Sequence, residues 1–255
     1  MGYPEMILSR LTLLTLLAGA CSPTEDSSAQ DVDSSASRVP KVLLIGIDGV
    51  RPDSLAAAET PNLDRLSRAG AINSQAQTCA HTVSGPSWMS ILTGVWPNKH
   101  GVNDNTFEGI DSANFPHFLA RAESIRADLR TVSITQWSPL MDKAVPGADF
   151  SSAPDSGAAV TIAAVDELSN NNPDLVFLHF DGADHAGHAS GYGPEFPEYI
   201  ESIENVDGEI GKVVAALNAR ATITEENWLI LVTTDHGGTG TSHGQDIPLH
   251  RTVFL

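Results

Sequence analysis

The sequence predicts an α/β fold, and three observations support this prediction. Four runs rich in apolar residues, 41–47, 129–135, 175–180 and 228–233, have the length and composition of strands, several of them typical of strands buried on both faces. Stretches with helical spacing of apolar residues separate these runs, as expected for strands joined by crossovers. The chain has 255 residues, 41% of them hydrophobic, which suffices for one domain with a sizeable core.

The amino terminus has the features of an export signal. In residues 1–20, Arg10 precedes an apolar run that is too short to span a bilayer and ends in small residues. Cys21 follows directly, as at a bacterial lipoprotein cleavage site, where the cysteine is lipidated. We therefore expect a bacterial periplasmic or cell-envelope lipoprotein, with an ordinary cleaved signal as the alternative. Residues 21–40 are small and polar and predict a disordered tether, which leaves 41–255 as the folded domain.

The charge balance excludes one class of partner. The chain has 32 acidic and 14 basic residues, and its formal net charge of -18 argues against binding nucleic acid through the phosphates. A solvated acidic surface explains most of the excess, and carboxylates that bind cations explain part of it. Cys79 has no partner if Cys21 is lipidated, so we expect a small buried residue and no disulfide framework.

Helices are predicted between the strands. Residues 60–66 combine a cap, a proline and helical spacing of leucines, and helical patterns also cover residues 114–127, 158–168 and 198–217. Residues 102–109 and 146–157 are predicted loops. Residues 251–255 begin a further strand where the chain stops, so we expect a domain truncated at its carboxyl end.

A short helix is predicted over residues 86–93. Pro86 suits the first position of a helix, and Gly94 suits the position just past its end. Ser84 would then lie immediately outside the amino end, where unpaired N–H groups and the helix dipole attract anions. Taken alone, this stretch favours an ordinary serine near a helix cap.

Carboxylate and imidazole groups follow the ends of three predicted strands. In open α/β sheets the carboxyl ends of the strands face the ligand, so we expect these groups to converge. Carboxylate oxygen together with imidazole nitrogen suits zinc and similar ions, whereas calcium and magnesium prefer almost all-oxygen shells. Six such groups are too many for one tetrahedral ion and fit two: Asp48, Asp184, His188, Asp235, His236 and His243.

A two-metal site is suited to phosphoryl transfer. One ion activates the attacking oxygen, and the other stabilises the leaving oxygen. A hydroxyl held by a metal ion is acidified without a histidine base, so Ser84 is the predicted nucleophile and a further metal ligand, with Thr82 as the alternative. Asn105, in the polar loop that follows, is a candidate for contact with a ligand.

The order of these motifs resembles the alkaline phosphatase superfamily, and more narrowly its type I phosphodiesterase/nucleotide pyrophosphatase branch. The motifs are I-D-G at Asp48, T-P-N-L-D-R-L at Thr60, a hydroxyl nine residues before T-G and then P-x-x-H-G, D-x-x-G-H at Asp184, and T-x-D-H-G at Thr233. They span residues 41–244. The resemblance implies a mixed, largely parallel sheet with helices on both faces, an alkaline phosphatase-like catalytic domain, and a phospho-enzyme intermediate hydrolysed in a second in-line step.

The resemblance also implies two Zn²⁺ ions, although other divalent ions can take the same ligands. One ion would be held by Asp184, His188 and His243, and the other by Asp48, Asp235, His236 and the Ser84 oxygen. Asn105 would donate to a phosphate oxygen. The expected partner is a small phosphate ester or diester, and membrane contact is expected only through a lipid on Cys21. The oligomeric state does not follow from the sequence.

Two features depart from the family pattern. Ser84 stands where these phosphodiesterases mostly have threonine, and Asp235 and His243 are only eight positions apart, where a long insertion is usual. The segment that recognises substrate is therefore missing or lies elsewhere.

S-G-P-S-W at Ser84 also resembles the sulfatase pattern C/S-x-P-S-R. Trp88 replaces its arginine, and the histidine pair disfavours the single calcium ion of sulfatases.

The sequence alone is consistent with several functions. The sequence shows no obvious arginine clamp for a doubly charged monoester near the site. Arg51 follows Asp48 closely but can equally pair with Asp53, so diesters are favoured over monoesters. The alternatives to a phosphoric ester hydrolase are a sulfatase or phosphomutase of the same fold, a non-catalytic surface-tethered binding protein, and an inactive fragment.

Overall fold

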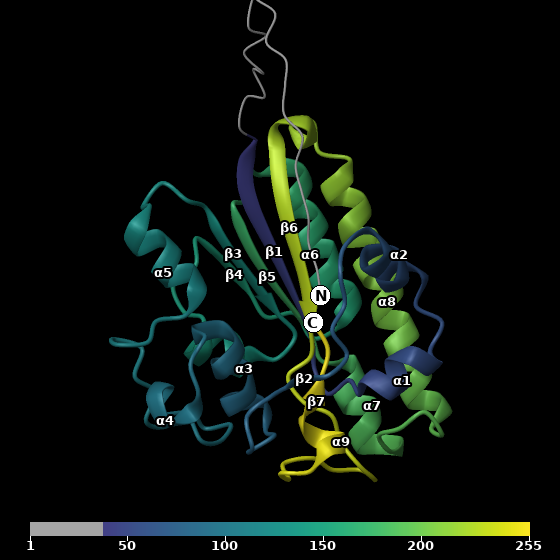
Figure 1. Cartoon of the computed structure of the whole chain (residues 1–255). Helices are drawn as coiled ribbons and strands as arrows, with labels where there is room; N and C mark the ends of the chain where they lie inside the picture. The colour runs from purple at the N-terminus through teal and green to yellow at the C-terminus, as the bar shows by residue number, and fades with distance from the viewer. Residues whose placement is uncertain (1–37) are drawn as a thin grey trace, which may run out of the picture. The chain divides into compact units, whose positions relative to one another are not determined.

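The computed structural model describes residues 38–255, and its centre is a five-stranded parallel sheet (Figure 1). The strand order is β4-β3-β5-β1-β6, with bounds β1 Val39–Ile47, β3 Thr131–Thr135, β4 Phe150–Ser152, β5 Leu175–Phe180 and β6 Glu226–Thr233. Antiparallel pairing between named strands is confined to a ribbon of β2 (Ala76–Gln77) and β7 (Thr252–Val253). The predicted α/β fold with a largely parallel sheet is confirmed. The predicted signal peptide and most of the predicted tether lie outside the described residues.

Helices cover both faces of the sheet (Figure 1). One face carries α6 (Gly157–Asn170), α7 (Gly182–Ser190) and α8 (Pro197–Asn218), with α1 (Pro52–Ala57) and α2 (Pro61–Ala69) packed against α8. The other face carries α3 (Ser84–Thr93), α5 (Phe118–Ile125) and a π-helical turn, η1 (Leu140–Ala144), and α4 (Pro97–His100) packs against α3. A 3-10 turn, η2 (Ile223–Glu225), precedes β6, and α9 (Pro248–Arg251) precedes β7.

The interior strand β1 shows why the chain needs two layers of helices. Ile45 and its alternate neighbours on β1 belong to the core under α6 and α8, while Leu44 belongs to the core under α3 and α5. Successive side chains of a strand point to opposite faces, so a run of apolar residues is stable only when both faces are covered. The uninterrupted apolar run in the sequence is explained by this double burial.

Strand register brings the strand ends to one edge. Ile47 of β1 lies opposite Phe180 of β5, and Gly46 lies opposite Thr233 of β6. The Asp48 N–H donates to the Phe180 carbonyl at 2.8 Å and continues the ladder by one residue. The aspartates that follow these three strands therefore emerge side by side.

Two local predictions were wrong. The helix predicted over residues 86–93 begins at Ser84, because the Ser87 N–H donates to the Val83 carbonyl at 3.1 Å and closes one more turn. Pro86 is tolerated there because N–H groups in the first turn have no partner within the helix. The predicted loop 146–157 contains β4, a three-residue edge strand too short to show an alternating pattern.

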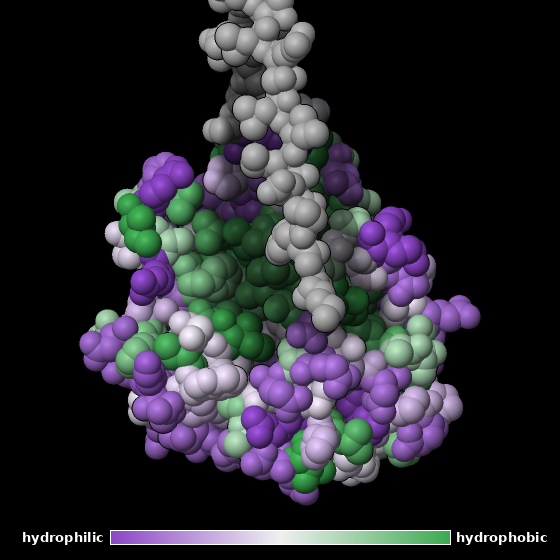
Figure 2. Space-filling model, viewed as in Figure 1, coloured by the Kyte–Doolittle hydropathy of each residue, from purple (hydrophilic) through white to green (hydrophobic). Residues whose placement is uncertain are grey.

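The edge of the sheet at β6 is apolar, and no further described strand pairs with it. Leu229 on β6 is 55% exposed, and a groove of about 700 Å³ lies beside this strand, lined in part by Leu66, Leu231 and Phe254. Figure 2 shows apolar surface in the hollow beside β6. Within residues 38–255, no helix is long and apolar enough to cross a membrane.

Candidate functional site

Two buried carboxylates lie at the carboxyl ends of neighbouring strands. Asp48 follows β1 and is 1% exposed, and Asp235 lies two residues after β6 and is fully buried. Asp48 Oδ2 accepts the Trp88 indole N–H at 2.7 Å, and Asp235 Oδ1 accepts the Gly49 N–H at 3.1 Å. The remaining oxygens, Asp48 Oδ1 and Asp235 Oδ2, have no hydrogen-bond partner in the described part of the chain. Each carboxylate thus has one oxygen held by the protein and one oxygen free.

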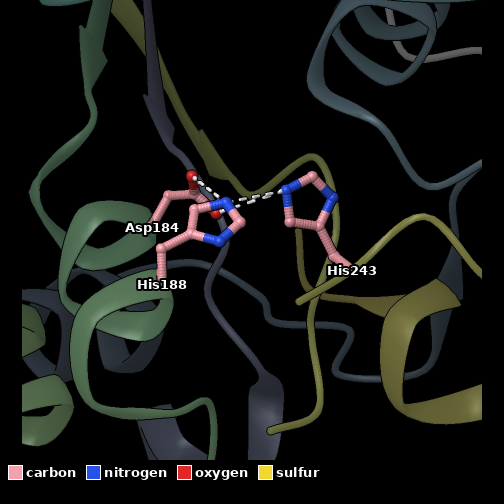
Figure 3. Close-up of side chains that lie close together, drawn as sticks. All are labelled: Asp184, His188 and His243. Carbon is pink, nitrogen blue, oxygen red and sulfur yellow. Dashed lines mark hydrogen bonds and ion pairs between the residues drawn. The ribbon is translucent and has the colours of Figure 1, made fainter. Parts of the chain in front are cut away.

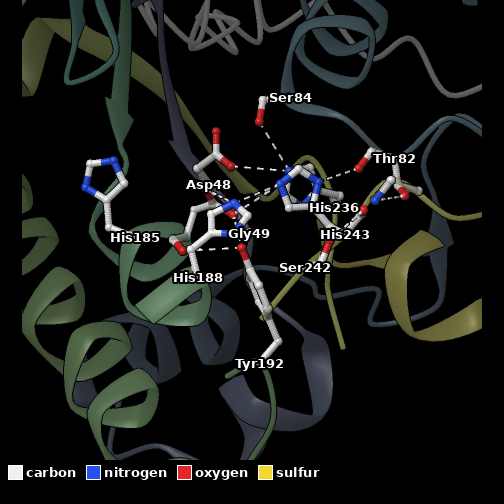
Figure 4. Close-up of polar contacts among 12 residues, drawn as sticks. Asp48, Gly49, Thr82, Ser84, His185, His188, Tyr192, His236, Ser242 and His243 are labelled. Carbon is white, nitrogen blue, oxygen red and sulfur yellow. Dashed lines mark hydrogen bonds and ion pairs between the residues drawn. The ribbon is translucent and has the colours of Figure 1, made fainter. Parts of the chain in front are cut away.

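His236 presents a third acceptor to the same point (Figure 4). Its Nε2 lies 3.5 Å from Asp48 Oδ1, 3.4 Å from Asp235 Oδ2 and 3.3 Å from Ser84 Oγ. Its Nδ1 lies 3.0 Å from the Gly237 carbonyl, which only accepts, so the ring proton is on Nδ1 and Nε2 carries a lone pair. Buried acceptor atoms gathered in this way fit a bound cation.

A second cluster is formed by Asp184, His188 and His243 (Figure 3). Helix α7 places Asp184 and His188 one turn apart on the same face, and the loop after β6 brings His243 to them. His188 Nε2 lies 3.4 Å from Asp184 Oδ2 and 3.1 Å from His243 Nε2, and His243 Nε2 lies 3.9 Å from Asp184 Oδ1. The D-x-x-G-H spacing therefore places both of its ligand types on one helix face.

The two histidines of this cluster have the same tautomer as His236. His188 Nδ1 donates to the Thr241 carbonyl at 3.0 Å, and His243 Nδ1 donates to the Thr82 carbonyl at 2.8 Å. Metal-binding histidines characteristically donate their second N–H in this way. Ligand atoms of Asp48, Asp184 and His236 also lie within 4.8 Å of one another, so the two clusters adjoin.

Ser84 and Thr82 have different roles in the structure. Ser84, the first residue of α3, is 7% exposed and directs its hydroxyl to His236. The fully buried Thr82 hydroxyl donates to the Gln245 carbonyl and accepts the Gly244 N–H, both at 3.0 Å. Thr82 thereby holds the loop that carries His243, and Ser84 is the hydroxyl that faces the clusters.

Asn105 lies next to the start of α3. Its Oδ1 accepts the Gly85 N–H at 2.7 Å, and no described residue pairs with its amide nitrogen. A Cβ on Gly85 would lie 2.5 Å from the Asp104 carbonyl oxygen, so only glycine permits this close approach. The geometry leaves the Asn105 amide free to donate to a ligand near Ser84.

Burial perturbs the titration of the site. It raises the pKa of Asp48 and of Asp235 well above the usual range of a carboxyl group. The nearby Asp184 raises the pKa of Asp48 further, and Asp48 in turn raises that of Asp235. Burial also lowers the pKa of His236 and His243 and keeps both rings neutral. Neutral imidazoles are the metal-binding form, and a divalent cation would favour the ionised carboxylates. The donor set therefore fits two divalent ions.

Arg51 is occupied by structural contacts. It donates to Asp53 through Nε at 2.9 Å and through Nη2 at 2.5 Å, and its Nη1 donates to the Tyr192 carbonyl at 3.0 Å. Of the two roles that the sequence left open for Arg51, the structure shows the pairing with Asp53. This arginine is therefore not available to clamp a phosphate.

Sequence reasoning missed three residues that contact the clusters. His179, fully buried on β5, has Nε2 3.0 Å from Asp48 Oδ2, and its signal was a single histidine in an otherwise apolar strand. Asp181 directly follows that strand, and its carboxylate pairs with the His185 ring. In Figure 4 the His185 ring is turned away from the clusters. The Tyr192 hydroxyl donates to Asp184 Oδ1 at 2.5 Å, a contact with no local sequence signal.

Known proteins share both the sequence pattern and the fold. Human bis(5'-adenosyl)-triphosphatase ENPP4 is 34% identical over 86 residues, which are 34% of this chain and 18% of the human protein. The structure of murine ectonucleotide pyrophosphatase/phosphodiesterase 5 superposes with a TM-score of 0.63 at 23% identity, covering 78% of this chain and 57% of the murine chain. Phosphonoacetate hydrolase from Sinorhizobium meliloti gives a TM-score of 0.56 at 22% identity, covering 78% and 56% of the two chains.

The match to the family extends over almost the whole folded region. This chain spans less than a fifth of the human relative and a little more than half of the two solved chains. Residues 42–124 and 114–254 match the family described as type I phosphodiesterase/nucleotide pyrophosphatase, and these ranges contain every residue of the two clusters. The chain therefore belongs to the type I phosphodiesterase/nucleotide pyrophosphatase family, within the alkaline phosphatase superfamily.

Proposed function

We propose that this chain is a metal-dependent phosphoric ester hydrolase that uses Ser84 as its nucleophile. The observation that carries the proposal is the convergence of three histidine lone pairs with the free oxygens of Asp48 and Asp235, beside the Ser84 hydroxyl. Membership of the family supports the same reaction class. A binding protein would not need a buried hydroxyl aimed at this point.

The proposed ligand sets follow from the two clusters. Asp184, His188 and His243 would hold one ion, and Asp48, Asp235, His236 and the Ser84 oxygen would hold the other. Two divalent ions, when bound there, supply positive charge that lowers the pKa of the Ser84 hydroxyl and neutralises the phosphoryl oxygens. The donor types suit zinc best.

The protein groups would act in two steps. Ser84 Oγ forms a bond to phosphorus while the bond from phosphorus to the leaving oxygen breaks, which gives a phosphoserine. A water molecule then attacks the same phosphorus in line and releases Ser84 and the phosphate product. The Asn105 amide donates to a phosphoryl oxygen, and the amino end of α3 stabilises its negative charge.

Diesters and pyrophosphates are the favoured substrates. A monoester carries two negative charges on its phosphate and is usually recognised by an arginine fork. Arg51 is held by Asp53 and the Tyr192 carbonyl, so a singly charged diester suits the site better.

Metal analysis combined with three assays tests the proposal. Purified protein and its Ser84→Ala variant are compared on nitrophenyl phosphate, bis-nitrophenyl phosphate and nitrophenyl sulfate. We expect two zinc ions per chain and diester turnover that Ser84→Ala abolishes. One calcium ion with sulfate turnover would establish a sulfatase instead, and phosphate binding without any turnover would establish a binding protein.

A further inference from the structure

Two nitrogen donors, Trp88 and His179, converge on one oxygen of Asp48. The Trp88 indole Nε1 lies 2.7 Å and the His179 Nε2 lies 3.0 Å from Asp48 Oδ2. We propose that Trp88 and His179 are positioning residues that fix the Asp48 carboxylate with Oδ1 facing the ion shared with Asp235 and His236. This inference rests on the proposed function, because it concerns the same metal site.

The direction of both hydrogen bonds follows from chemistry. An indole N–H can only donate, and an ionised carboxylate can only accept. His179 Nε2 must therefore carry the ring proton, and its Nδ1 has no partner within residues 38–255. This is the opposite tautomer to that of His188, His236 and His243, whose Nε2 atoms are free. The tautomers thus separate three candidate ligands from one positioning histidine.

The Trp88 ring fits into the core because Gly46 has no side chain. Trp88 is fully buried, and its ring packs edge-on to His179 with centroids 5.0 Å apart and tilted against Phe177 at 6.1 Å. A Cβ on Gly46 would lie 2.2 Å from Trp88 Cη2. A glycine inside a central strand is therefore explained by the close approach of this ring. Trp88, which in the sequence only marked a departure from sulfatases, lies where it supports a proposed metal ligand.

The same contacts argue against a third ion. Ligand atoms of Asp48, His179 and Asp181 lie within 4.8 Å of one another and resemble a metal site by distance alone. Asp48 Oδ2 already accepts two N–H bonds, and one of them comes from His179 itself. A proton on His179 Nε2 is incompatible with an ion bound at that nitrogen, so this group is a scaffold for Asp48.

Zinc titration against a chromophoric chelator tests the role of Trp88. Trp88→Phe keeps an aromatic ring but removes the N–H, and we expect one of the two zinc affinities to fall about 10- to 100-fold while the other is unchanged. Trp228→Phe is the matched control, because its indole N–H also donates to a carboxylate, Glu226 Oε2 at 2.6 Å, at the amino end of β1 and away from the clusters. The control should keep both affinities.

A pair of His179 variants provides a second, independent test. Glutamine can place an N–H where His179 Nε2 lies, whereas leucine cannot, so His179→Gln should keep most of the affinity that His179→Leu loses. Equal affinities for the two variants, or a folded Trp88→Phe with wild-type binding of both ions, would overturn the positioning role. A wild-type protein that binds fewer than two ions would instead contradict the proposed function. Three ions in wild type and two in His179→Leu would show that His179 is a ligand.

Discussion

His188 and His243 face each other through their Nε2 atoms at 3.1 Å, although both rings carry their proton on Nδ1. Two lone pairs at this distance repel unless a proton or a cation lies between them. Both rings are fixed by backbone carbonyls, so the repulsion is part of the folded structure. The fold thus directs both Nε2 atoms to a common point, where a cation would remove the repulsion.

Removal of metal should destabilise the protein. The free oxygens of Asp48 and Asp235 are buried, and without a cation they stay unsatisfied. We expect chelation to lower the melting temperature and added zinc to restore it, with a stabilisation of about 4 kcal/mol when free zinc is about 1,000 times Kd. Calorimetry with and without chelator measures this. Equal melting temperatures would show that the clusters hold no ion.

The two neighbouring hydroxyls should respond differently to substitution. Ser84→Ala should abolish turnover and change the free energy of unfolding of the metal-free protein by less than about 0.5 kcal/mol, because the Ser84 hydroxyl only contacts His236. Thr82→Val should cost about 2 kcal/mol, because it leaves the Gly244 N–H and the Gln245 carbonyl without their partner. Denaturant unfolding together with diester assays separates these effects. Turnover in Ser84→Ala that is lost in Thr82→Val would assign the nucleophile to Thr82.

Gly46→Ala should be strongly destabilising. The new methyl group would overlap the Trp88 ring at 2.2 Å, and forced overpacking of a core costs about 2 kcal/mol. Gly208→Ala in α8 is the control, because its Cβ meets nothing within 4 Å and alanine is favoured in helices. Urea unfolding of the metal-free proteins compares the two. A Gly46→Ala protein as stable as Gly208→Ala would contradict the close packing of Trp88 on β1.

A buried ion pair at the other end of the sheet predicts a pH dependence. Hydrogen bonds from Arg220 lower the pKa of Glu226 from 4.5 to about 2. Because the pKa in the folded state lies below that in the unfolded state, the stabilisation is complete above pH 4.5 and is lost as the pH falls towards 2. Glu226→Gln should therefore cost about 2 kcal/mol at pH 7, because it removes charge-assisted hydrogen bonds from Arg220, and the difference should shrink below pH 4.5. Unfolding free energies measured between pH 3.5 and 7 check this, and a difference that does not change with pH would refute it.

The sequence was sufficient to predict the strands that carry the site. Asp48 and Asp235 could be assigned to strand ends because uninterrupted apolar runs precede them, a pattern typical of parallel strands, although β6 lies at the end of the sheet with Leu229 exposed. The family resemblance placed Asp184 and His188 in one ligand set, although the helix that makes them neighbours was not predicted.

Other contacts could not be predicted because they join distant parts of the chain. Trp88 and His179 reach Asp48 from a helix on one face and from the neighbouring strand, and neither has a local pattern that differs from a core residue. Thr82 could not be separated from Ser84 by spacing alone. The distinction comes from the loop after β6, which folds back onto the Thr82 hydroxyl.

Anomalous scattering at the zinc edge from crystals of the zinc-loaded protein tests the central claim most directly. We expect two peaks, one among Asp184, His188 and His243 and the other among Asp48, Asp235 and His236 beside Ser84 Oγ, about 4 Å apart. A single peak, or a peak between His179 and Asp181, would contradict the two-ion site proposed here.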